Sequence, residues 1–508
     1  MKEVERKTVL FCIDPAVTLH GTWKKVIEEV HQLRPNLVVG VASFGQSASE
    51  EKIIHPGVAF VDELNELDIL NINKSAEAIE QFDVFASSPS YQRFRFAALK
   101  LLNRKDFTGT LRFLEREVIV ENAVLVAMTT LIRRTPSLLV FDVTPHQLMP
   151  FVFYAVAEWL GISTLHFSPS PVSPAMMPMK SFGVRFALSE GHVADSKVAG
   201  PLVRTAKESI EKLQRGIAPT YMQHQIARDI VTNSFHQRFR ALSSAVRWLF
   251  CERFPDSIDF GGHPRKSSFI RRALKIFLTR SLQKTLKQAV MDLGYRLPKP
   301  TGYAIFALHY EPERTSIPDG FPFDSQTTAI CKARGLLPPS HELVVKEHYS
   351  QQSSAKRGFL GRSPLFYDMV SHLDGVSFAS TSSGLIQLLA GSSCVFTLTG
   401  TIALEAVLRG VPVAYFGNPW WEGLPGTIRI ESEVSFESIS RLRMPEPIEV
   451  EEFVVGLTSH HMVPGLAGEK VNTVESRLGP LPFEFFEEEA RSIALCISSM
   501  LLNNSTGR

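Results

Sequence analysis

Hydrophobic positions in the first third of the chain alternate between short continuous runs and longer stretches with helical spacing. The runs predict strands at Thr8–Ile13, Leu37–Val41, Phe82–Ala86, Ser137–Phe141 and Ile162–Phe167. Helical spacing follows at Gly21–Leu33, Leu111–Arg133 and His146–Leu160. Continuous apolar strands that alternate with helices are typical of a parallel sheet covered on both faces.

Ligands of such sheets bind beyond the carboxyl ends of the strands. In this part of the chain Asp14 and Asp142 directly follow predicted strands, as do the turn Thr144–His146 and the proline-rich loop Ser168–Pro174. These residues are therefore candidates for a ligand site.

The last two fifths of the chain repeat the α/β pattern. The predicted strands are Gly302–Leu308, Glu342–Lys346, Gly375–Ala379, Cys394–Leu398 and Val411–Phe416. The intervening region, 200–299, is charged and helical in pattern, and the tail Phe483–Leu502 has the spacing of an amphipathic helix. The sequence thus predicts two similar halves, a helical connection and a C-terminal closing helix.

Composition agrees with a two-domain globular protein. With 508 residues the chain is longer than the chains that usually form a single hydrophobic core. Its residues are 44% hydrophobic and 21% charged, which is typical of globular proteins. We expect an α/β protein with two Rossmann-like domains. The expected parts are 1–199 (N-terminal Rossmann-like domain), 200–300 (basic helical connection), 301–480 (C-terminal Rossmann-like domain) and 481–508 (helix and tail).

The cysteines and the N-terminus indicate a cytosolic protein. Five scattered cysteines lack metal-ligand spacing and are typical of reduced core thiols. Met1–Lys7 mixes acids and bases before a short apolar run, unlike a signal peptide. We expect no membrane span, no metal and no cofactor. A net charge of +2 gives no reason to expect a nucleic-acid partner.

The most informative segment is Thr399-Gly400-Thr401, which lies between two predicted strands and is followed by Glu405. Backbone N–H groups where a helix begins suit a phosphate or diphosphate. Glu405 lies one helical turn further, where a carboxylate can accept two ribose hydroxyls. The alternative is a strand–turn–helix connection in which Gly400 only permits a tight bend.

Two further polar segments follow predicted strands. After the first strand of the second half come His309, Glu311, Glu313 and Arg314; Arg314 suits a phosphate or carboxylate, and His309 or a glutamate suits proton transfer. The alternative is an ordinary polar loop.

The second segment is Lys346-Glu347-His348. On an extended strand end Lys346 and His348 share one face, where they would stabilise a departing phosphate in place of a metal. The alternative is a solvated strand end.

These segments resemble the capsule-polysaccharide biosynthesis and export family, whose best-understood members resemble Kdo (ketodeoxyoctonate) transferases. The resemblance covers about residues 300–425. The matching segments are His309-Tyr310-Glu311-Pro312-Glu313, Lys346-Glu347-His348, Thr399-Gly400 with Glu405-Ala406, and Pro412-Val413 with Phe416-Gly417. Tyr349 and Glu311 depart from the family's usual proline and glutamine, and Asn418-Pro419-Trp420-Trp421 is bulkier than its usual segment.

The resemblance implies a two-domain glycosyltransferase of the GT-B type, with the acceptor on the side of domain 1–199 and the nucleotide-sugar bound by domain 301–480. The donor would be a nucleotide-activated sugar, with CMP-linked sugars as one candidate, and the acceptor a surface or capsular glycan or a glycolipid. The donor-binding residues would be Arg314, Lys346, His348, Thr399, Gly400, Thr401 and Glu405. Sugar transfer needs a carboxylate near the anomeric carbon, for which Glu311, Glu313, Asp14 and Asp142 are candidates.

Two alternatives remain open. A nucleotide-sugar epimerase of the same architecture would use the Gly400–Glu405 site without an acceptor. A non-enzymatic scaffold for capsule assembly or export would keep the fold, and the departures at Tyr349 and Glu311 support it.

A basic segment lies in the connection between the halves. Eight lysines or arginines and no acid occur between Asp259 and Asp292, interleaved with apolar residues near helical spacing. The candidates for membrane or glycan contact are Arg271, Arg272, Lys275, Arg280 and Lys284. Each cation near an anionic bilayer contributes on the order of 1 kcal/mol, so we expect peripheral association with the inner membrane face. The alternative is a helix whose apolar face packs on its own domain.

Overall fold

A computed structural model describes most of the chain. The described residues are 7–13, 22–44, 57–64, 75–104, 106, 111–188, 196–217, 269–292, 302–353, 358–379, 384–467 and 471–503. They form two compact units. The first comprises 1–102, 112–209 and 454–508, and the second comprises 103–111 and 210–453.

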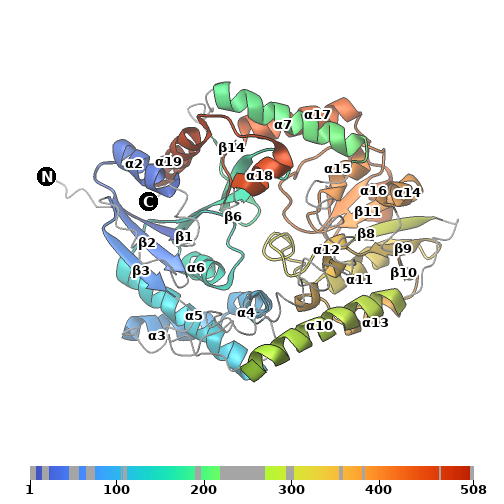
Figure 1. Cartoon of the computed structure of the whole chain (residues 1–508), viewed down its shortest axis with the longest axis horizontal. Coiled ribbons are helices and arrows are strands. Elements are labelled where there is room, and N and C mark those ends of the chain that lie inside the picture. The colour runs from blue at the N-terminus through green and yellow to red at the C-terminus, as the bar shows by residue number, and fades with distance from the viewer. Residues whose placement is uncertain are drawn as a thin grey trace. The chain divides into compact units, whose positions relative to one another are not determined.

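The first unit is built on a mostly parallel sheet (Figure 1). Its strands are β1 (Thr8–Ile13), β2 (Val38–Phe44), β3 (Phe60–Leu64), β4 (Leu138–Phe141), β5 (Ser163–Pro169), β6 (Ala175–Ser181), β7 (Val184–Arg185) and β14 (Val463–Pro464). Their order is β14-β6-β5-β4-β1-β2-β3, with β7 paired to β6. The strands β3, β2, β1, β4 and β5 are parallel, and β6 is antiparallel to β5.

Helices cover both faces of this sheet. The helices of the first unit include α2 (Thr22–Leu33), α3 (Ala76–Ala86), α4 (Pro89–Leu102), α5 (Phe113–Arg134), α6 (Leu148–Trp159), α18 (Val471–Leu478) and α19 (Phe485–Asn503). The closing helix α19 packs against α2, and Ile497 is buried in one core with Val26 and Phe11. The apolar runs of the sequence therefore do form a parallel sheet with buried faces.

The sequence-based prediction of a strand at Phe82–Ala86 is wrong. This segment is the second half of α3, which begins after Ser75, whose hydroxyl accepts the Ala78 N–H at 3.1 Å. Ala78 and Phe85 are both buried, seven residues apart, as one helix face requires. The third strand is instead β3, which the sequence analysis did not identify.

The second unit has a fully parallel sheet. Its strands are β8 (Tyr303–Ala307), β9 (Glu342–Lys346), β10 (Val376–Phe378), β11 (Ser392–Thr397), β12 (Val413–Tyr415) and β13 (Thr427–Arg429). Their order is β10-β9-β8-β11-β12-β13. In chain order this is 3-2-1-4-5-6, the strand order of dinucleotide-binding sheets, so the order reverses between β8 and β11.

Helices again lie on both sides of this sheet (Figure 1). They are α10 (Phe269–Asp292), α11 (Gln326–Leu336), α12 (Tyr349–Gln352), η3 (Gly358–Leu360), α13 (Pro364–Ser371), α14 (Leu385–Ala390), α15 (Ile402–Val407) and α16 (Phe436–Ser440). Four of them contribute to the same hydrophobic core as Phe306 of the central strand, through Leu286, Ile330, Tyr367 and Ile439. Two further helices, α7 (Ser196–Gln214) and α17 (Pro447–His460), cross the boundaries between the units.

The protein is thus an α/β protein with two Rossmann-like domains. None of the helices in the described ranges combines the length and the hydrophobicity that crossing a bilayer requires.

Candidate functional site

The candidate site lies in the second unit, where the strand order reverses between β8 and β11. His309 follows β8 and is 7% exposed, and its Nε2 accepts the backbone N–H of Thr399, which follows β11, at 3.1 Å. The carboxyl ends of the two strands are thereby tied together. Because ligands of open α/β sheets bind beyond the strands at such a reversal, this is the expected place for one.

The contact with Thr399 fixes the protonation of the His309 ring. Since Nε2 accepts a hydrogen bond, the ring is neutral and carries its hydrogen on Nδ1. Burial, with the nearby charges of His348 and Arg362, lowers the pKa of His309 to about 3. At neutral pH His309 is therefore a hydrogen-bond donor through Nδ1.

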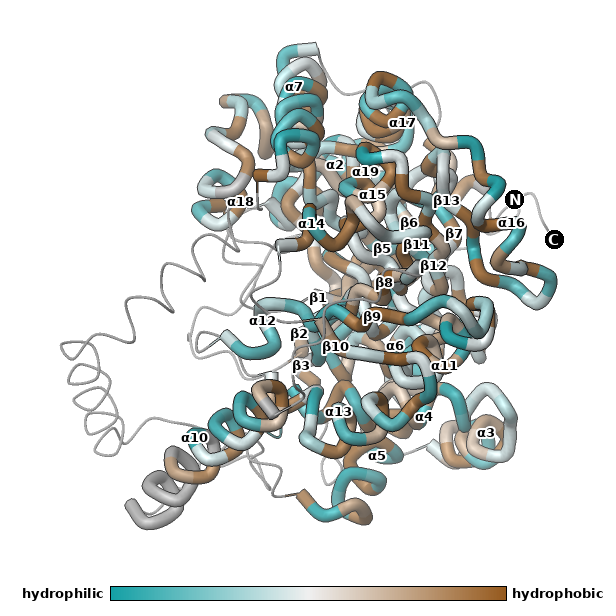
Figure 2. The backbone as a smooth tube through the Cα atoms, turned by 90° about the vertical axis from the view of Figure 1, so that its right-hand side faces the viewer, coloured by the Kyte–Doolittle hydropathy of each residue, from teal (hydrophilic) through white to brown (hydrophobic). Residues whose placement is uncertain are grey.

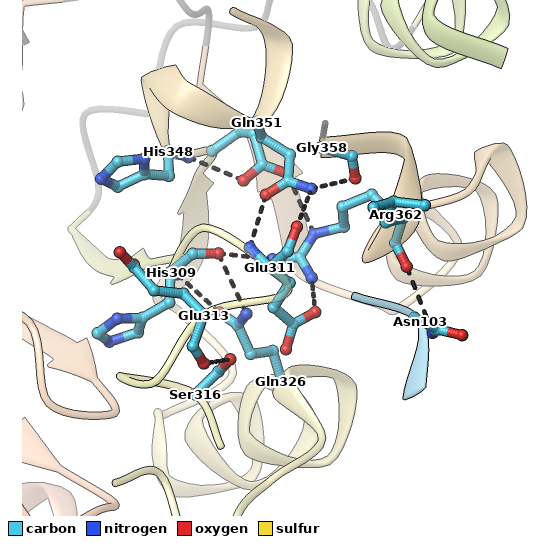
Figure 3. Close-up of polar contacts among 12 residues, drawn as sticks. Asn103, His309, Glu311, Glu313, Ser316, Gln326, His348, Gln351, Gly358 and Arg362 are labelled. Atoms are coloured by element: carbon cyan, nitrogen blue, oxygen red, sulfur yellow. Dashed lines mark hydrogen bonds and ion pairs between the residues drawn. The ribbon is translucent and has the colours of Figure 1, made fainter. Parts of the chain in front are cut away.

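Two glutamines and one arginine hold the loop that carries His309 (Figure 3). The amide of Gln326 accepts the His309 N–H at 2.8 Å and donates to the His309 carbonyl at 3.2 Å. The amide of Gln351 accepts the Glu311 N–H at 2.9 Å and donates to the Glu311 carbonyl at 3.0 Å. Arg362 Nη2 also donates to the His309 carbonyl, at 3.1 Å. All three side chains are buried, so the loop is fixed before any ligand arrives.

Arg362 is the centre of a buried ionic network. Its side chain is 1% exposed; Nη1 pairs with Glu311 Oε2, and Nε lies 3.3 Å from Glu347 Oε2. Tyr367 donates its hydroxyl to the same Glu347 oxygen at 2.7 Å, and burial together with the Glu347 charge raises the pKa of Tyr367. Inside the second unit the carboxylates of Glu311 and Glu347 are thus paired with Arg362, and Glu347 also accepts a hydrogen bond from Tyr367.

Lys346 and His348 follow β9, the strand beside β8. Burial lowers the pKa of Lys346 to about 8, against the opposing effect of Glu347. His348 precedes α12, and its Nδ1 accepts the Ser350 N–H at 3.1 Å, which leaves the ring hydrogen of the neutral form on Nε2. Figure 3 shows the His309 and His348 rings projecting to the same side of the loop. Glu347 is directed to the opposite side, into the Arg362 network.

The turn after β11 is held by short polar contacts. The Thr397 hydroxyl lies 3.3 Å from His309 Nε2 and accepts the Gly400 N–H at 3.2 Å, while the Thr399 hydroxyl donates to the Thr315 carbonyl at 2.9 Å. A Cβ on Gly400 would lie 2.8 Å from the Thr397 hydroxyl oxygen, so glycine is needed here for close approach. The N–H groups of Thr399 and Gly400, expected from sequence to bind phosphate, already bind protein atoms.

The helix predicted to begin at Thr401 is α15, and Thr401 is its N-cap. Glu405 lies one turn further, and burial raises the pKa of its carboxyl, opposed by the charge of Arg409. The guanidinium of Arg409 donates to the Glu405 carbonyl at 2.8 Å. A partly buried carboxylate therefore stands in the first turn after the Gly400 turn, as the sequence predicted.

A second charged cluster adjoins the loop after β8. Arg314 Nε lies 3.3 Å from Asp319 Oδ2, and burial raises the pKa of Asp319 to about 6. Within the described part of the chain, Arg314 Nη1 is buried with no hydrogen-bond partner. Burial lowers the pKa of Arg104 to about 10, and the charge of Glu313 partly opposes this effect. Because its pKa also responds to Arg314 and Asp319, Arg104 belongs to this cluster although it is distant in sequence. The Thr315 hydroxyl donates to Glu313 Oε2 at 3.2 Å.

The remaining candidates lie elsewhere. Asp142 follows β4 in the first unit, where the strand order of that sheet reverses between β1 and β4, and it is 8% exposed. Burial and the Asp142 charge raise the pKa of Cys12. Asp14 and the side chains of Arg271, Arg272 and Lys275 lie outside the described residues, whereas Arg280 and Lys284 are exposed on α10.

Several residues of the site could not be assigned roles from sequence. They are Arg104, Asp319, Gln326, Gln351, Arg362 and Tyr367. Arg362 contacts His309 across 53 positions and Gln351 contacts Glu311 across 40, so no local spacing connects them.

Among the described residues, no group of three or more His, Cys, Asp or Glu side chains could hold a metal ion. Metal independence stays a prediction from the sequence.

No protein-family model matches the chain. No curated protein sequence matches it either.

Solved structures are similar to the chain at low sequence identity. The beta Kdo 2,7 transferase of Thermosulfurimonas dismutans KpsC is 9% identical, with 75% of this chain and 89% of that chain covered and a TM-score of 0.28. The UDP-GlcNAc 2-epimerase of Neisseria meningitidis bound to UDP-GlcNAc is 12% identical, with 98% and 100% covered and a TM-score of 0.21. The glycosyltransferase SnogD of Streptomyces nogalater is 13% identical, with 97% and 99% covered and a TM-score of 0.20.

These structures include Kdo transferases. The best-understood members of the family that residues 300–425 resemble are similar to such transferases. At such TM-scores the likeness decides nothing about individual residues. The assignment of two Rossmann-like domains rests on the strand order of the two sheets.

Proposed function

We propose that this protein is a glycosyltransferase that moves a sugar from a nucleotide-activated donor to a glycan or glycolipid acceptor. The observation that carries the proposal is the hydrogen bond from the Thr399 N–H to His309 Nε2 where the second sheet reverses its strand order. Lys346 and His348 stand at the end of the neighbouring strand β9, and Glu405 stands in α15, which follows β11. All three therefore belong to the segments that follow the strands at the edge where such sheets bind nucleotides.

The proposed roles follow from hydrogen-bond capacity. The His309 ring carries its hydrogen on Nδ1, the neutral His348 ring carries it on Nε2, and Lys346 is positively charged below a pKa of about 8. Donors in fixed positions stabilise the negative charge that develops on a departing phosphate. The partly buried acceptor Glu405 suits the two ribose hydroxyls.

The structure supports different roles for the candidate carboxylates. Glu311 is paired with the buried Arg362, which supports a role in positioning the His309 loop. Glu313 accepts a hydrogen bond from Thr315 beside the two arginines of the second cluster, and Arg314 has a free Nη1 there. We propose that Arg314 binds an anionic group of a substrate. Glu313, Asp142 and Asp14 remain the candidates for the carboxylate near the anomeric carbon.

The finer parts of the proposal rest on the sequence resemblance. They are a CMP-linked or other nucleotide-linked donor, a surface or capsular polysaccharide as the acceptor, and a reaction without metal. The proposed place of action is the cytoplasmic face of a bacterial membrane.

The test is a transfer assay with CMP-, UDP-, GDP- and dTDP-linked sugars, with and without a panel of oligosaccharide and glycolipid acceptors. We expect nucleotide release that depends on an acceptor. Glu405→Gln should abolish it, whereas Glu433→Gln, which changes an exposed glutamate of the same unit, should leave it intact. Conversion of the donor sugar without any acceptor would instead identify an epimerase. Neither activity nor nucleotide binding would favour the scaffold.

A further inference from the structure

The helix α10 has one face packed on the second unit. Leu286 is 3% exposed and belongs to the core that contains Phe306, and Ala289 and Val290 pack against the same core. The helix contacts α13, beside which it lies in Figure 1. Part of the apolar pattern seen in the sequence is therefore used inside the protein, as the alternative interpretation of this helix expected.

The opposite face of α10 carries a different pattern. Phe277, Arg280, Lys284, Lys287 and Met291 follow one another at spacings of three, four, three and four residues, which places them in one row along the helix. Every side chain in this row is exposed, Phe277 at 70% and Met291 at 66%. We call these five residues the basic row. The sequence of α10 contains no acid before its last residue, Asp292.

The composition of the basic row fits one kind of partner. Three cations without an acid on the helix before Asp292 attract an anionic surface. The row begins and ends with a large apolar side chain, Phe277 and Met291. Leu278 and Leu282, eight and four residues before the buried Leu286, lie on the packed side of the helix instead. Exposed apolar side chains beside cations are typical of helices that lie in the interface of a bilayer. An acidic polysaccharide would use the cations but not Phe277 and Met291.

We propose that the basic row docks the protein on a bilayer that contains anionic lipid, with the cations at the head groups and Phe277 and Met291 in the apolar boundary. Figure 2 shows hydrophilic and hydrophobic residues close together along α10. Docking goes beyond sugar transfer. It would bring the second unit to a surface where a lipid-linked acceptor is concentrated.

The test is co-sedimentation of the full chain with phosphatidylcholine vesicles, with and without phosphatidylglycerol. We expect binding only to the vesicles with phosphatidylglycerol, and weaker binding at higher salt. The variant Arg280→Gln/Lys284→Gln/Lys287→Gln should bind on the order of 100-fold more weakly, because each cation contributes about a factor of five. Phe277→Ser/Met291→Ser should also weaken binding, because it removes the apolar contacts.

A matched control separates docking from a general charge effect. Lys24→Gln/Arg93→Gln/Arg204→Gln removes three exposed cations of α2, α4 and α7, so its net charge equals that of the first variant. It should bind the vesicles as the wild type does. Unchanged circular dichroism and an unchanged nucleotide-induced thermal shift would show that the variants are folded and that the donor site is intact.

Three results would overturn the proposal. They are equal binding to both kinds of vesicle, wild-type binding by the basic-row triple variant, and retention on heparin without binding to vesicles. The last result would identify an acidic polymer as the partner. A failure of the transfer assay leaves the vesicle result unaffected, so the two proposals can fail separately.

Discussion

Backbone N–H groups fix the hydrogen positions on two histidines of the second unit. His309 accepts at Nε2 and His348 at Nδ1, so in their neutral forms the two rings carry their hydrogens on opposite nitrogens. The sequence predicted that both side chains belong to the site. It could not predict which nitrogen carries the hydrogen, because Thr399 is 90 positions from His309.

The low pKa of His309 predicts a loss of stability in acid. Unfolded His309 binds a proton below its usual pKa near 6.5, whereas the folded ring stays neutral until about pH 3. The folded state is therefore favoured fully above pH 6.5 and progressively less as the pH falls, by about 2 kcal/mol at pH 5. Between pH 7 and pH 5 the free energy of unfolding, measured in urea, should therefore fall by about 2 kcal/mol less in His309→Gln than in the wild type.

The exposed His372 provides a control, since His372→Gln should keep the wild-type dependence on pH. If the stability of the His309 and His372 variants depends on pH in the same way, His309 is not a buried neutral ring in the folded protein.

The pKa of Lys346 predicts how nucleotide binding depends on pH. The ammonium group loses its charge above about pH 8, so affinity should fall as the pH rises through that value, up to tenfold per unit. Lys346→Arg keeps its charge and should bind with little change up to pH 10. Calorimetric titrations from pH 6 to 10 test this, with the exposed Lys24→Arg as control. The same decline in the wild type and Lys346→Arg would show that another group is responsible.

The loop after β8 is a rigid element because side chains from three other segments bind its backbone. Gln326 belongs to α11, Gln351 to α12, and Arg362 lies between η3 and α13. A Cβ on Gly361 would lie 2.4 Å from the Glu311 carbonyl carbon, so this approach also requires glycine. The sequence predicted the strand and the polar loop, whereas the clamps depend on tertiary packing.

Removing Arg362 should be costly. Arg362→Met leaves Glu347, whose side chain is 2% exposed, without its counter-charge, and we expect a loss of about 3–5 kcal/mol in unfolding free energy. The control is Arg441→Met, which breaks a pair with Glu437 that is 77% and 69% exposed and should cost at most about 1 kcal/mol. Urea unfolding measures both.

The double variant Arg362→Met/Glu347→Gln should recover part of the loss, because it removes the uncompensated charge. Equal costs for Arg362→Met and Arg441→Met would contradict a buried network.

Local patterns explain both the success and the error in predicting the elements. The strands of both sheets that line the reversal points were predicted to within a few residues, because buried parallel strands are short continuous apolar runs. Phe82–Ala86 is also apolar except for Asp83, but it continues the helix that Ser75 caps, with Phe85 buried on the same face as Ala78. A short run alone does not separate a buried strand from one face of a helix.

The two sheets share one strand order around β1 and β8. The order 3-2-1-4-5 occurs in both, and in each the reversal lies beside a residue that the sequence analysis selected, Asp142 in the first unit and His309 in the second. The α/β alternation predicted two halves. It could not predict that α19 completes the core of the first unit, because that contact joins Ile497 to residues near the N-terminus.

The central claim is that the reversal point of the second sheet binds a nucleotide, and a thermal-shift screen against CMP, UDP, GDP and dTDP tests it most directly. A nucleotide at about 100 times its dissociation constant should stabilise the protein by roughly 2.7 kcal/mol. We predict a shift with one nucleotide that Glu405→Ala abolishes and Glu433→Ala retains. No shift with any nucleotide, or an undiminished shift in Glu405→Ala, would contradict the account.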